Sequence, residues 1–441
     1  MRITFVMPCV GRKKRGSYVK TWQMEPLAIA VLSALTPPGH EKSFYDDRIE
    51  QPRYDERPDL VAINVETYTA RRAYRIAAEY RSRGSKVVMG GFHATLIPEE
   101  VEAEADSVVV GPAEGVWPLV VADAEAGRLR KRYEASAGME FGKTLPDRSV
   151  YAKYRYMPVA LLETGRGCVF HCDFCSIRSF FRQRYVPREV SEVVREIQAL
   201  GRRTYFFIDD NLGANRPHLR SLLEALVPLK VRWIGQISLD AADDPAVLDL
   251  MRASGCMGVL IGFESLSAAN LASMNKRVNS RHSDYGRAVE ELRRRRIAVY
   301  ATFIFGYPHD TGQSFELTYR FSQEQRFFFT AFNHLVPFPG TDLYAELERS
   351  GKLLYRKWWL EPGYRFGDVA FEPHGMSAKE LSLSCLAYRR KFHGASSLLR
   401  RGTDFMANIS DFRKFFIFWG QGLTGRRDVE RRQGLPLGET E

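Results

Sequence analysis

The first third of the chain alternates short apolar runs with longer amphipathic segments. Apolar runs of about four to eight residues predict buried strands, and apolar residues recurring every turn predict helices. We predict strands at Arg2–Pro8, Lys42–Tyr45, Leu60–Val65, Lys86–Met89 and Ser107–Val110, and helices at Leu27–Leu35, Ala70–Arg83 and Val101–Ala105. Because strands that alternate with helices form a parallel sheet covered by helices, residues 1–130 are predicted to be a Rossmann-like α/β domain.

The alternation restarts after a polar, irregular segment at residues 131–156, which we interpret as a linker. Further strands are predicted at Val159–Glu163, Thr204–Ile208, Val231–Ile237, Gly258–Phe263, Ala298–Phe305 and Ala331–Leu335, and helices at Val190–Leu200, Leu219–Leu226, Pro245–Ser254 and Ser283–Arg295. Strand–helix units without a closing seventh or eighth predict an incomplete barrel over residues 157–345. Residues 346–441 are expected to be mostly helical.

Composition and charge narrow the class of protein. The 441 residues are 45% hydrophobic and 27% charged, an ordinary globular mixture that excludes wholesale disorder. The net charge of +11 is a mild basic excess that suits an anionic partner. The six cysteines form no disulfide framework, the N-terminus is predicted to be a strand rather than a secretion signal, and no apolar run is long enough to span a membrane. We therefore expect a cytoplasmic protein.

Three cysteines crowd into one loop after the first strand of the second domain. Cys168, Cys172 and Cys175 have the spacing C-x3-C-x2-C, and Gly165 and Gly167 precede them. Three thiolates on one tight loop can ligate three irons of a [4Fe–4S] cluster. The fourth iron then lacks a protein ligand and is open to a small chelating molecule.

A zinc knuckle or a coincidental cluster is the alternative. Zinc is usually held by four protein ligands in two pairs. His171 and Cys172 are adjacent and could hardly both reach one tetrahedral ion, and the other cysteines offer no second pair. Cys9, Cys256 and Cys385 are interpreted as buried or incidental thiols. The spacing favours an iron–sulfur cluster.

The cysteine loop resembles that of the radical S-adenosylmethionine (SAM) superfamily, whose mark is this spacing with an aromatic residue, here Phe174, before the last cysteine. The resemblance covers residues 157–340 and implies a partial (β/α)6 barrel in which SAM binds the open iron. It implies an external electron donor, such as flavodoxin or ferredoxin, and cleavage of SAM to methionine and a 5′-deoxyadenosyl radical. Phe174 would shield the cluster from water.

The same resemblance assigns SAM contacts to the carboxyl ends of the predicted strands. The candidates are Asp209, Asp210, Asn211, Gln236, Ser238, Glu264 and Gly306. The segment 209–211 would hold the SAM amino group, Glu264 would contact the ribose, and Gly306 lies where the adenine usually stacks. Each carboxylate taken alone fits a solvated loop acid, but their joint placement at strand ends favours binding.

A glycine pair and a second glycine follow two strands of the first domain. Gly90-Gly91-Phe92-His93 follows one strand and Gly111 the next. This pattern resembles the cobalamin-binding domain of many radical SAM enzymes, in the branch with the anaerobic Mg-protoporphyrin cyclase and the hopanoid and phosphinate methylases. It implies cobalamin contacts from Thr67, Thr69, Gly90, Gly91, His93 and Gly111. A plain helix–sheet packing turn is the alternative.

The first domain differs from other cobalamin-binding domains in the loop that supplies the histidine ligand of cobalt. Met7-Pro8-Cys9-Val10-Gly11 occupies the loop where other cobalamin proteins carry an Asp-x-His-x-x-Gly motif with an axial histidine. The branch often lacks this motif, which leaves the cobalt without a histidine. The gap also fits a domain that has lost cobalamin.

Two further segments are rich in basic residues, and the second of them also contains aromatic residues. Arg12-Lys13-Lys14-Arg15 is interpreted as a solvated loop, with an anion clamp as the alternative. Residues 412–419 mix aromatic and basic side chains, which predicts a core-packing helix. A membrane-surface contact or a lid over an apolar substrate is the alternative there.

These features predict a cobalamin-dependent radical SAM methyltransferase that acts on an unactivated carbon or a phosphinate of a natural-product or lipid-like small molecule. A carbon radical cannot accept a methyl cation from SAM because both centres are electron-poor, whereas methylcobalamin can supply a methyl radical equivalent. The alternatives are an oxidative cyclase or ring-rearranging enzyme, a tRNA methylthiotransferase, and a non-catalytic metal-binding scaffold. The chain lacks the N-terminal cysteine set and RNA-binding tail of the methylthiotransferases, so no nucleic-acid partner is expected.

Overall fold

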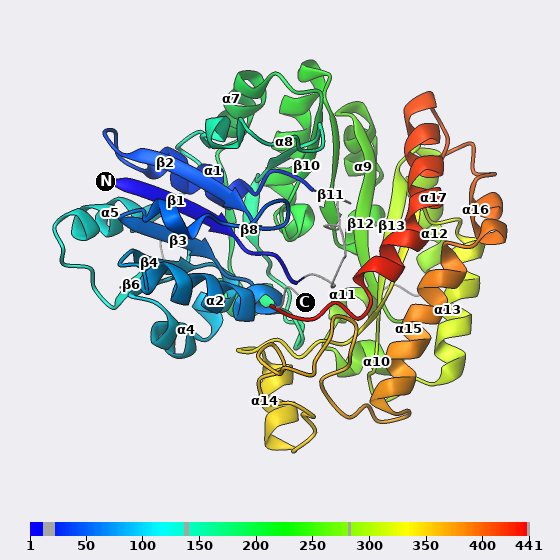
Figure 1. Cartoon of the computed structure of the whole chain (residues 1–441). Helices are drawn as coiled ribbons and strands as arrows, with labels where there is room; N and C mark the ends of the chain where they lie inside the picture. Colours follow the sequence, from blue (N-terminus) through cyan, green and yellow to red (C-terminus); the bar gives the residue numbers. More distant parts are fainter. Residues whose placement is uncertain (12–22, 136–140, 281–283, 439–441) are drawn as a thin grey trace. The chain divides into compact units, whose positions relative to one another are not determined.

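The computed structural model describes residues 1–11, 23–135, 141–280 and 284–438, which fold into two compact units (Figure 1). The first unit comprises Met1–Met157, Tyr355–Phe366 and Gly434–Glu441, and the second comprises Pro158–Leu354 and Gly367–Gln433. The basic segment Arg12–Arg15 lies outside the described residues.

The first unit contains a six-stranded, wholly parallel sheet. Its strands are β1 (Arg2–Met7), β2 (Glu41–Asp46), β3 (Leu60–Asn64), β4 (Lys86–Gly90), β5 (Ser107–Val110) and β6 (Arg132–Glu134), in the order β2-β1-β3-β4-β5-β6. The helices are α1 (Leu27–Leu35), α2 (Ala70–Arg81), α3 (Phe92–Leu96), α4 (Pro98–Glu104) and α5 (Trp117–Glu125). Central strand β3 is buried on both faces, as expected when helices cover both sides of a parallel sheet. The Rossmann-like prediction is confirmed.

Part of the predicted linker belongs to this unit instead. Arg132–Glu134 forms the edge strand β6, and the buried hydroxyl of Tyr133 donates a 2.9 Å hydrogen bond to Asp123. Further along, Tyr151 packs into the core of the first unit. Isolated aromatic residues in a polar segment give no periodicity, so the sequence pattern could not reveal this strand.

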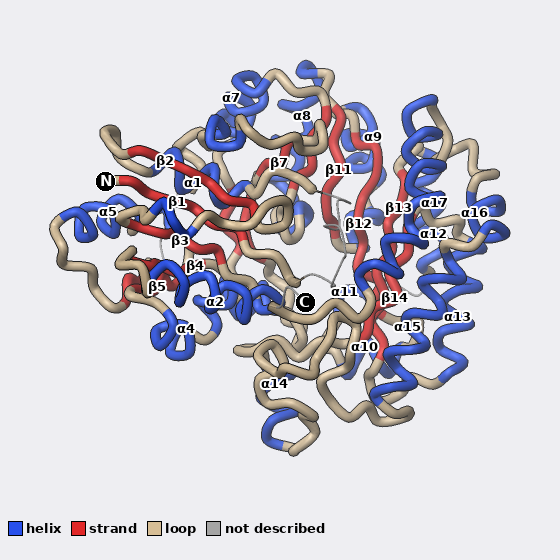
Figure 2. Tube along the Cα trace, in the orientation of Figure 1, coloured by secondary structure: helices blue, strands red, loops and turns tan. Residues whose placement is uncertain are grey.

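The second unit contains another six-stranded parallel sheet (Figure 2). Its strands are β7 (Ala160–Leu162), β10 (Thr204–Phe207), β11 (Arg232–Ile237), β12 (Cys256–Glu264), β13 (Ala298–Phe305) and β14 (Phe329–His334), in the order β14-β13-β12-β11-β10-β7. Between them lie α7 (Val190–Leu200), α8 (Arg216–Leu226), α9 (Pro245–Ala253), α12 (Tyr285–Arg294) and α13 (Gly312–Glu324). In the described residues β7 and β14 are the outer strands, so the sheet is the open, partial barrel that was predicted.

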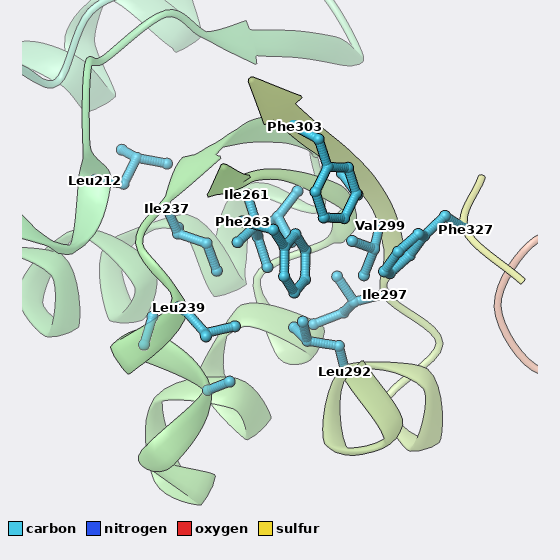
Figure 3. Packing of buried hydrophobic residues seen from close by; sticks show 14 of the residues in the cluster. Leu212, Ile237, Leu239, Ile261, Phe263, Leu292, Ile297, Val299, Phe303 and Phe327 are labelled. Atoms are coloured by element: carbon cyan, nitrogen blue, oxygen red, sulfur yellow. The ribbon is translucent and has the colours of Figure 1, made fainter. Parts of the chain in front are cut away.

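The helix-facing side of this sheet carries the core of the second unit (Figure 3). Phe263 stacks on Phe303 with ring centroids 5.7 Å apart and contacts Phe327 at 5.3 Å. The opposite face differs, because its side chains stay partly exposed. These residues include Leu161, Phe206, Ile234, Leu260 and Ile304. A closed eight-stranded barrel fills this space with side chains, whereas here an apolar face is left open to a ligand.

The C-terminal part is helical, as predicted. It contains α14 (Asp342–Arg349), α15 (Ala378–Phe392), α16 (Ala395–Arg401) and α17 (Phe412–Arg432). Helix α15 packs on β14, where Arg389 donates a 3.0 Å hydrogen bond to the carbonyl oxygen of Phe332. Tyr355–Phe366, in contrast, joins the first unit. No helix among the described residues has the length and apolar content needed to cross a bilayer.

Candidate active site

The cysteine loop is the connection of a two-stranded antiparallel ribbon. Strand β8 (Gly165–Gly167) pairs with β9 (Tyr185–Pro187), and the short helix α6 (Ser176–Phe181) follows the last cysteine. Gly167 has a φ of 85°, and a Cβ there would collide with the carbonyl oxygen of Arg184. A Cβ on Gly165 would collide with the Tyr185 ring. The glycines are therefore required for the close approach of the two ribbon strands.

The three thiols lie near one another and near a lysine. The pKa of Cys172 is raised to about 12, mainly by burial; Lys276 lowers it, and the Cys175 and Cys168 thiols raise it. Burial also raises the pKa of Cys175. Thiols that raise each other's pKa bind metal with release of their protons, and the metal then relieves the repulsion between the thiolates.

The structure does not gather the sulfurs as ligands of a single ion. Among the described residues, no group of three or more His, Cys, Asp or Glu side chains is placed to hold one metal ion. A [4Fe–4S] cluster differs, because each thiolate binds a different iron. One loop with three mutually interacting thiols fits three ligands of such a cluster.

The polar segment at the end of β10 supports the ribbon. Asp209 is buried and accepts hydrogen bonds from the backbone N–H and hydroxyl of Thr164, at 2.9 and 2.6 Å. Asp210 accepts a 2.8 Å bond from the N–H of Gly167. Burial raises the pKa of Asp209 to about 7 and that of Asp210 to about 6. In this structure both carboxylates position the chain that leads into the cysteine loop.

Asn211 links the cysteine loop to the next strand end. Its side-chain N–H donates to the hydroxyl of Ser238 at 3.2 Å and lies 3.9 Å from the sulfur of Cys168. Its side-chain oxygen accepts from the N–H of Ser238 at 3.1 Å. Gln236 lies two residues earlier on β11, on the partly exposed face of the sheet. Asn211, Ser238 and the first cysteine thus lie close together, and their contact with SAM stays a prediction.

Glu264 ends β12 and forms a buried ion pair with Lys276. The Lys276 ammonium lies 3.1 Å from Oε1 of Glu264. Glu264 has a φ of 61°, a left-handed conformation that is rare outside glycine, at an irregularity in the pairing with β13. Burial alone would lower the pKa of Lys276, but Glu264 and the Cys172 thiol raise it. Lys276 is therefore a fixed positive charge between a strand end and the cysteines.

Two other predicted residues have packing roles. Gly306 has a φ of 113°, and a Cβ there would stand 2.8 Å from a methyl carbon of Leu381. Its N–H donates a 2.9 Å hydrogen bond to Asp310. Phe174 is partly buried and packs against the core of the second unit.

In the first unit, backbone conformation or close packing explains why glycine stands at two of the three predicted positions. Gly91 has a φ of 107°, and a Cβ there would stand 2.5 Å from the side-chain oxygen of Asn64, at the end of β3. A Cβ on Gly90 would meet only ordinary contacts. Gly111 has a φ of 81° and donates its N–H to Thr95 at 2.9 Å. The Thr69 hydroxyl closes the turn after β3 by bonding the backbone of Glu66.

His93 is the centre of a buried polar network. Its Nδ1 lies 3.2 Å from the hydroxyl of Thr67, and its Nε2 lies 3.2 Å from Glu100. Tyr74 and Trp359 also donate to Glu100, at 2.8 and 2.9 Å, and Lys357 forms a 3.0 Å ion pair with it. Since both ring nitrogens of His93 are engaged, this histidine is not a free ligand for cobalt. The edge of the sheet fits a cobalamin that takes no histidine from the chain.

Comparison with known proteins finds a matching family for each of the two units. Residues 162–322 match the radical SAM superfamily, and residues 24–121 match the B12-binding domain. The bacteriochlorophyllide d C-12(1)-methyltransferase of Chlorobaculum tepidum is 31% identical over 390 residues, covering 85% of this chain and 84% of that protein. The chain belongs to the cobalamin-dependent radical SAM methyltransferases.

Two further relatives and one solved structure are similar to most of this chain. The C-8(2)-methyltransferase of the same organism is 29% identical over 361 residues, covering 75% of this chain and 78% of that protein. The anaerobic magnesium-protoporphyrin IX monomethyl ester cyclase of Cereibacter sphaeroides is 27% identical, covering 96% of this chain and 76% of that protein. In fold, the methyltransferase resembles the radical SAM methyltransferase TsrM from Kitasatospora setae, with a TM-score of 0.63, 19% identity and coverage of 99% and 91%.

The family membership defines the cofactors of this methyltransferase as a [4Fe–4S] cluster, SAM and cobalamin. Radical SAM enzymes act on small-molecule substrates with an electron from an external reductant.

Sequence reasoning missed two sets of residues at these sites. Lys276 lies in an ordinary-looking basic loop, and no motif marked it. Trp358 and Trp359 lie far from the first unit in sequence yet are buried within it, where Trp358 contacts Tyr68 with ring centroids 4.9 Å apart. The two adjacent tryptophans after the barrel were the one sequence feature that indicated a buried segment. The local pattern did not show which residues they contact.

Proposed function

We propose that this methyltransferase adds a methyl group to an unactivated carbon of a bacteriochlorophyllide-type macrocycle. The match to the C-12(1)-methyltransferase over 85% of the chain carries the proposal. The second bacteriochlorophyllide methyltransferase supports the same substrate class at 29% identity. The partly exposed apolar face of the second sheet, which includes Phe206 and Leu260, suits a flat and apolar substrate.

We assign the cofactor contacts residue by residue. Cys168, Cys172 and Cys175 hold the cluster, and Phe174 covers it. Lys276, fixed by Glu264, offers a positive charge to the carboxylate of SAM, and Gln236 faces the open side of the sheet. In the first unit, Thr67, Thr69, Gly90, Gly91 and Gly111 line the strand ends where we place cobalamin, and His93 supports that edge from within the core.

The bound cofactors supply SAM cleavage and delivery of a methyl group to a carbon radical. The chain's contribution is to hold the three thiolates and to keep the lysine charge near the cluster. Asp209 and Asp210 fix the ribbon from which the cysteine loop emerges. Asp210 accepts a hydrogen bond from the N–H of Gly167 in β8, and Asp209 accepts one from the N–H of Thr164 just before this strand. A substrate bound on the open apolar sheet face would displace water from that face.

The test is an anaerobic turnover assay of the reconstituted full chain. The reaction contains SAM, dithionite, methylcobalamin and bacteriochlorophyllide d, and the products are measured by liquid chromatography and mass spectrometry. We expect 5′-deoxyadenosine, S-adenosylhomocysteine and a macrocycle heavier by one methylene group in equal amounts. Cys172→Ala abolishes SAM cleavage. Cys256→Ala, which removes a buried thiol outside the loop, retains it.

The products also separate the competing activities. Deoxyadenosine without S-adenosylhomocysteine, together with a macrocycle oxidised by the loss of hydrogen, would identify an oxidative cyclase like the relative from Cereibacter sphaeroides. Methylation of a phosphinate but not of the macrocycle would refute the substrate class and keep the reaction. SAM cleavage by Cys172→Ala at the wild-type rate would refute the cluster assignment.

A further inference from the structure

The long helix α17 has two apolar faces, and only one of them is covered. Lys414, Phe418, Gly422 and Gly425 form the buried stripe along the second unit. On the opposite side, Phe412 is 76% exposed, Phe416 is 57% exposed and Leu423 is 72% exposed. Residues four and seven positions apart share one face of a helix, so these side chains form one outward stripe.

The segment before the helix extends this surface. Phe405 is 73% exposed and Met406 is 48% exposed. The turn that leads into this segment packs against the helix, because a Cβ on Gly402 would stand 3.0 Å from the Trp419 ring. We call the set the aromatic patch, comprising Phe405, Met406, Phe412, Phe415, Phe416 and Leu423.

Exposed arginines lie around the aromatic patch, together with Asp411, whose carboxylate caps the start of α17. Arg400, Arg413, Arg426 and Arg427 are exposed and have no acidic partner within the described parts of the chain. Arg413 and Arg427 flank the outward stripe on the helix, and Arg400 lies in the last turn of helix α16. The rim therefore carries a positive field over a surface that water solvates poorly.

Aromatic side chains with unpaired arginines on one face of a surface helix are the pattern of a peripheral membrane contact. The rings insert at the level of the headgroups, and the arginines bind anionic phosphates. The opposite face of α17 is anchored on the protein, so the helix can lie only along the membrane plane.

We propose that α17 and the segment before it bind the surface of an anionic membrane. The surface does not include the cysteine loop, and the proposal is independent of the proposed reaction. The contact holds the enzyme at a lipid surface without crossing it.

The test is flotation of the purified full chain with vesicles, one set of phosphatidylcholine and one of phosphatidylcholine with phosphatidylglycerol. We expect binding to the anionic vesicles, weakened by salt, and at least tenfold weaker binding to the neutral ones. The double variant Phe412→Ser with Phe416→Ser loses binding to both sets. Arg413→Gln with Arg427→Gln loses only the preference for anionic lipid.

Leu383→Ser is the matched control, since Leu383 is 53% exposed on α15, outside the aromatic patch. It binds like the wild type, and all variants keep the wild-type melting temperature because the substituted side chains are exposed. Absence of vesicle binding by the wild type, or equal binding by the Phe412→Ser, Phe416→Ser variant, would overturn the proposal. A wild-type dimer in sedimentation that this variant dissociates, without vesicle binding, would assign the patch to contact between two copies of the chain.

Discussion

The hydroxyl of Tyr307 donates a 2.8 Å hydrogen bond to the carboxylate of Asp173. Tyr307 follows the end of β13, and Asp173 lies between the second and third cysteines. The N–H of Asp173 is in turn held by the carbonyl oxygen of Met274 at 3.3 Å. The middle of the cysteine loop is thus tied to the barrel at two points far from its own ribbon.

Tyr307→Phe should loosen the cysteine loop. The substitution leaves the partly buried carboxylate of Asp173 without its hydroxyl donor. A hydrogen bond to a charged group contributes about 1.5–3 kcal/mol. We expect SAM cleavage to fall by at least about tenfold. The electron paramagnetic resonance spectrum of the reduced cluster, recorded with and without SAM, should broaden. Tyr300→Phe, on strand β13 itself, is the control. An unchanged spectrum and rate for Tyr307→Phe would show that this bond does not position the loop.

The Glu264–Lys276 pair offers a double-mutant cycle. Removing one member of a buried ion pair leaves an uncompensated charge, which typically costs about 3–5 kcal/mol, whereas removing both costs much less. Lys276→Met and Glu264→Gln should therefore each destabilise the second unit more than the double variant does. Urea unfolding of the cofactor-free chain measures this coupling, and equilibrium binding of SAM to the reconstituted chain should weaken in all three variants. Additive losses of stability would show that the two charges do not interact.

Glu100 should make the first unit sensitive to acid. Burial alone would raise the pKa of this carboxyl, but hydrogen bonds from His93, Trp359, Tyr74 and Lys357 lower it to about 2. A lowered pKa gives stability that is present above the unfolded value near 4.5 and is lost as the pH falls towards 2. The contribution is about 3 kcal/mol.

Glu100→Gln should remove that contribution at pH 7 and make unfolding of the first unit less dependent on pH between about 4.5 and 2. Tryptophan fluorescence follows the unfolding, because Trp359 donates to Glu100. Retention of hydroxocobalamin on gel filtration, followed by visible absorbance, should fall in the same variant if the network supports the cofactor edge. Glu99→Gln, at the exposed neighbouring position, is the control.

His334 should destabilise the second unit in mild acid. It is buried, neither ring nitrogen has a hydrogen-bond partner in the described structure, and burial lowers its pKa to about 3. Below about pH 6.5 the unfolded chain binds a proton here that the folded chain does not, so stability falls as the pH drops. Between pH 7 and pH 5 the loss is about 2 kcal/mol.

His334→Leu should abolish that part of the loss and leave the urea midpoint at pH 7 close to the wild type, because no hydrogen bond is removed. His374→Leu, at an exposed position, should keep the wild-type pH dependence. The same acid sensitivity in His334→Leu as in the wild type would assign the effect to other groups.

The sequence by itself determined the elements and the chemistry that are local along the chain. Strand Ala298–Phe305 and helices Leu27–Leu35 and Val190–Leu200 have the predicted bounds, because burial of one or both faces imposes a repeat that the residues display. The cysteine spacing is local in the same way, since three ligands on one loop need no partner from elsewhere.

Only the tertiary structure decided which side chains serve those local features. The predicted SAM contacts Asp209 and Asp210 hold the ribbon, and Lys276 reaches the cysteines although no motif marks it. Trp359 completes a network in the first unit from 259 residues away. The physical reason is that a hydrogen bond or ion pair depends on distance in space, whereas a sequence pattern records only the neighbours that share a helix face or a strand.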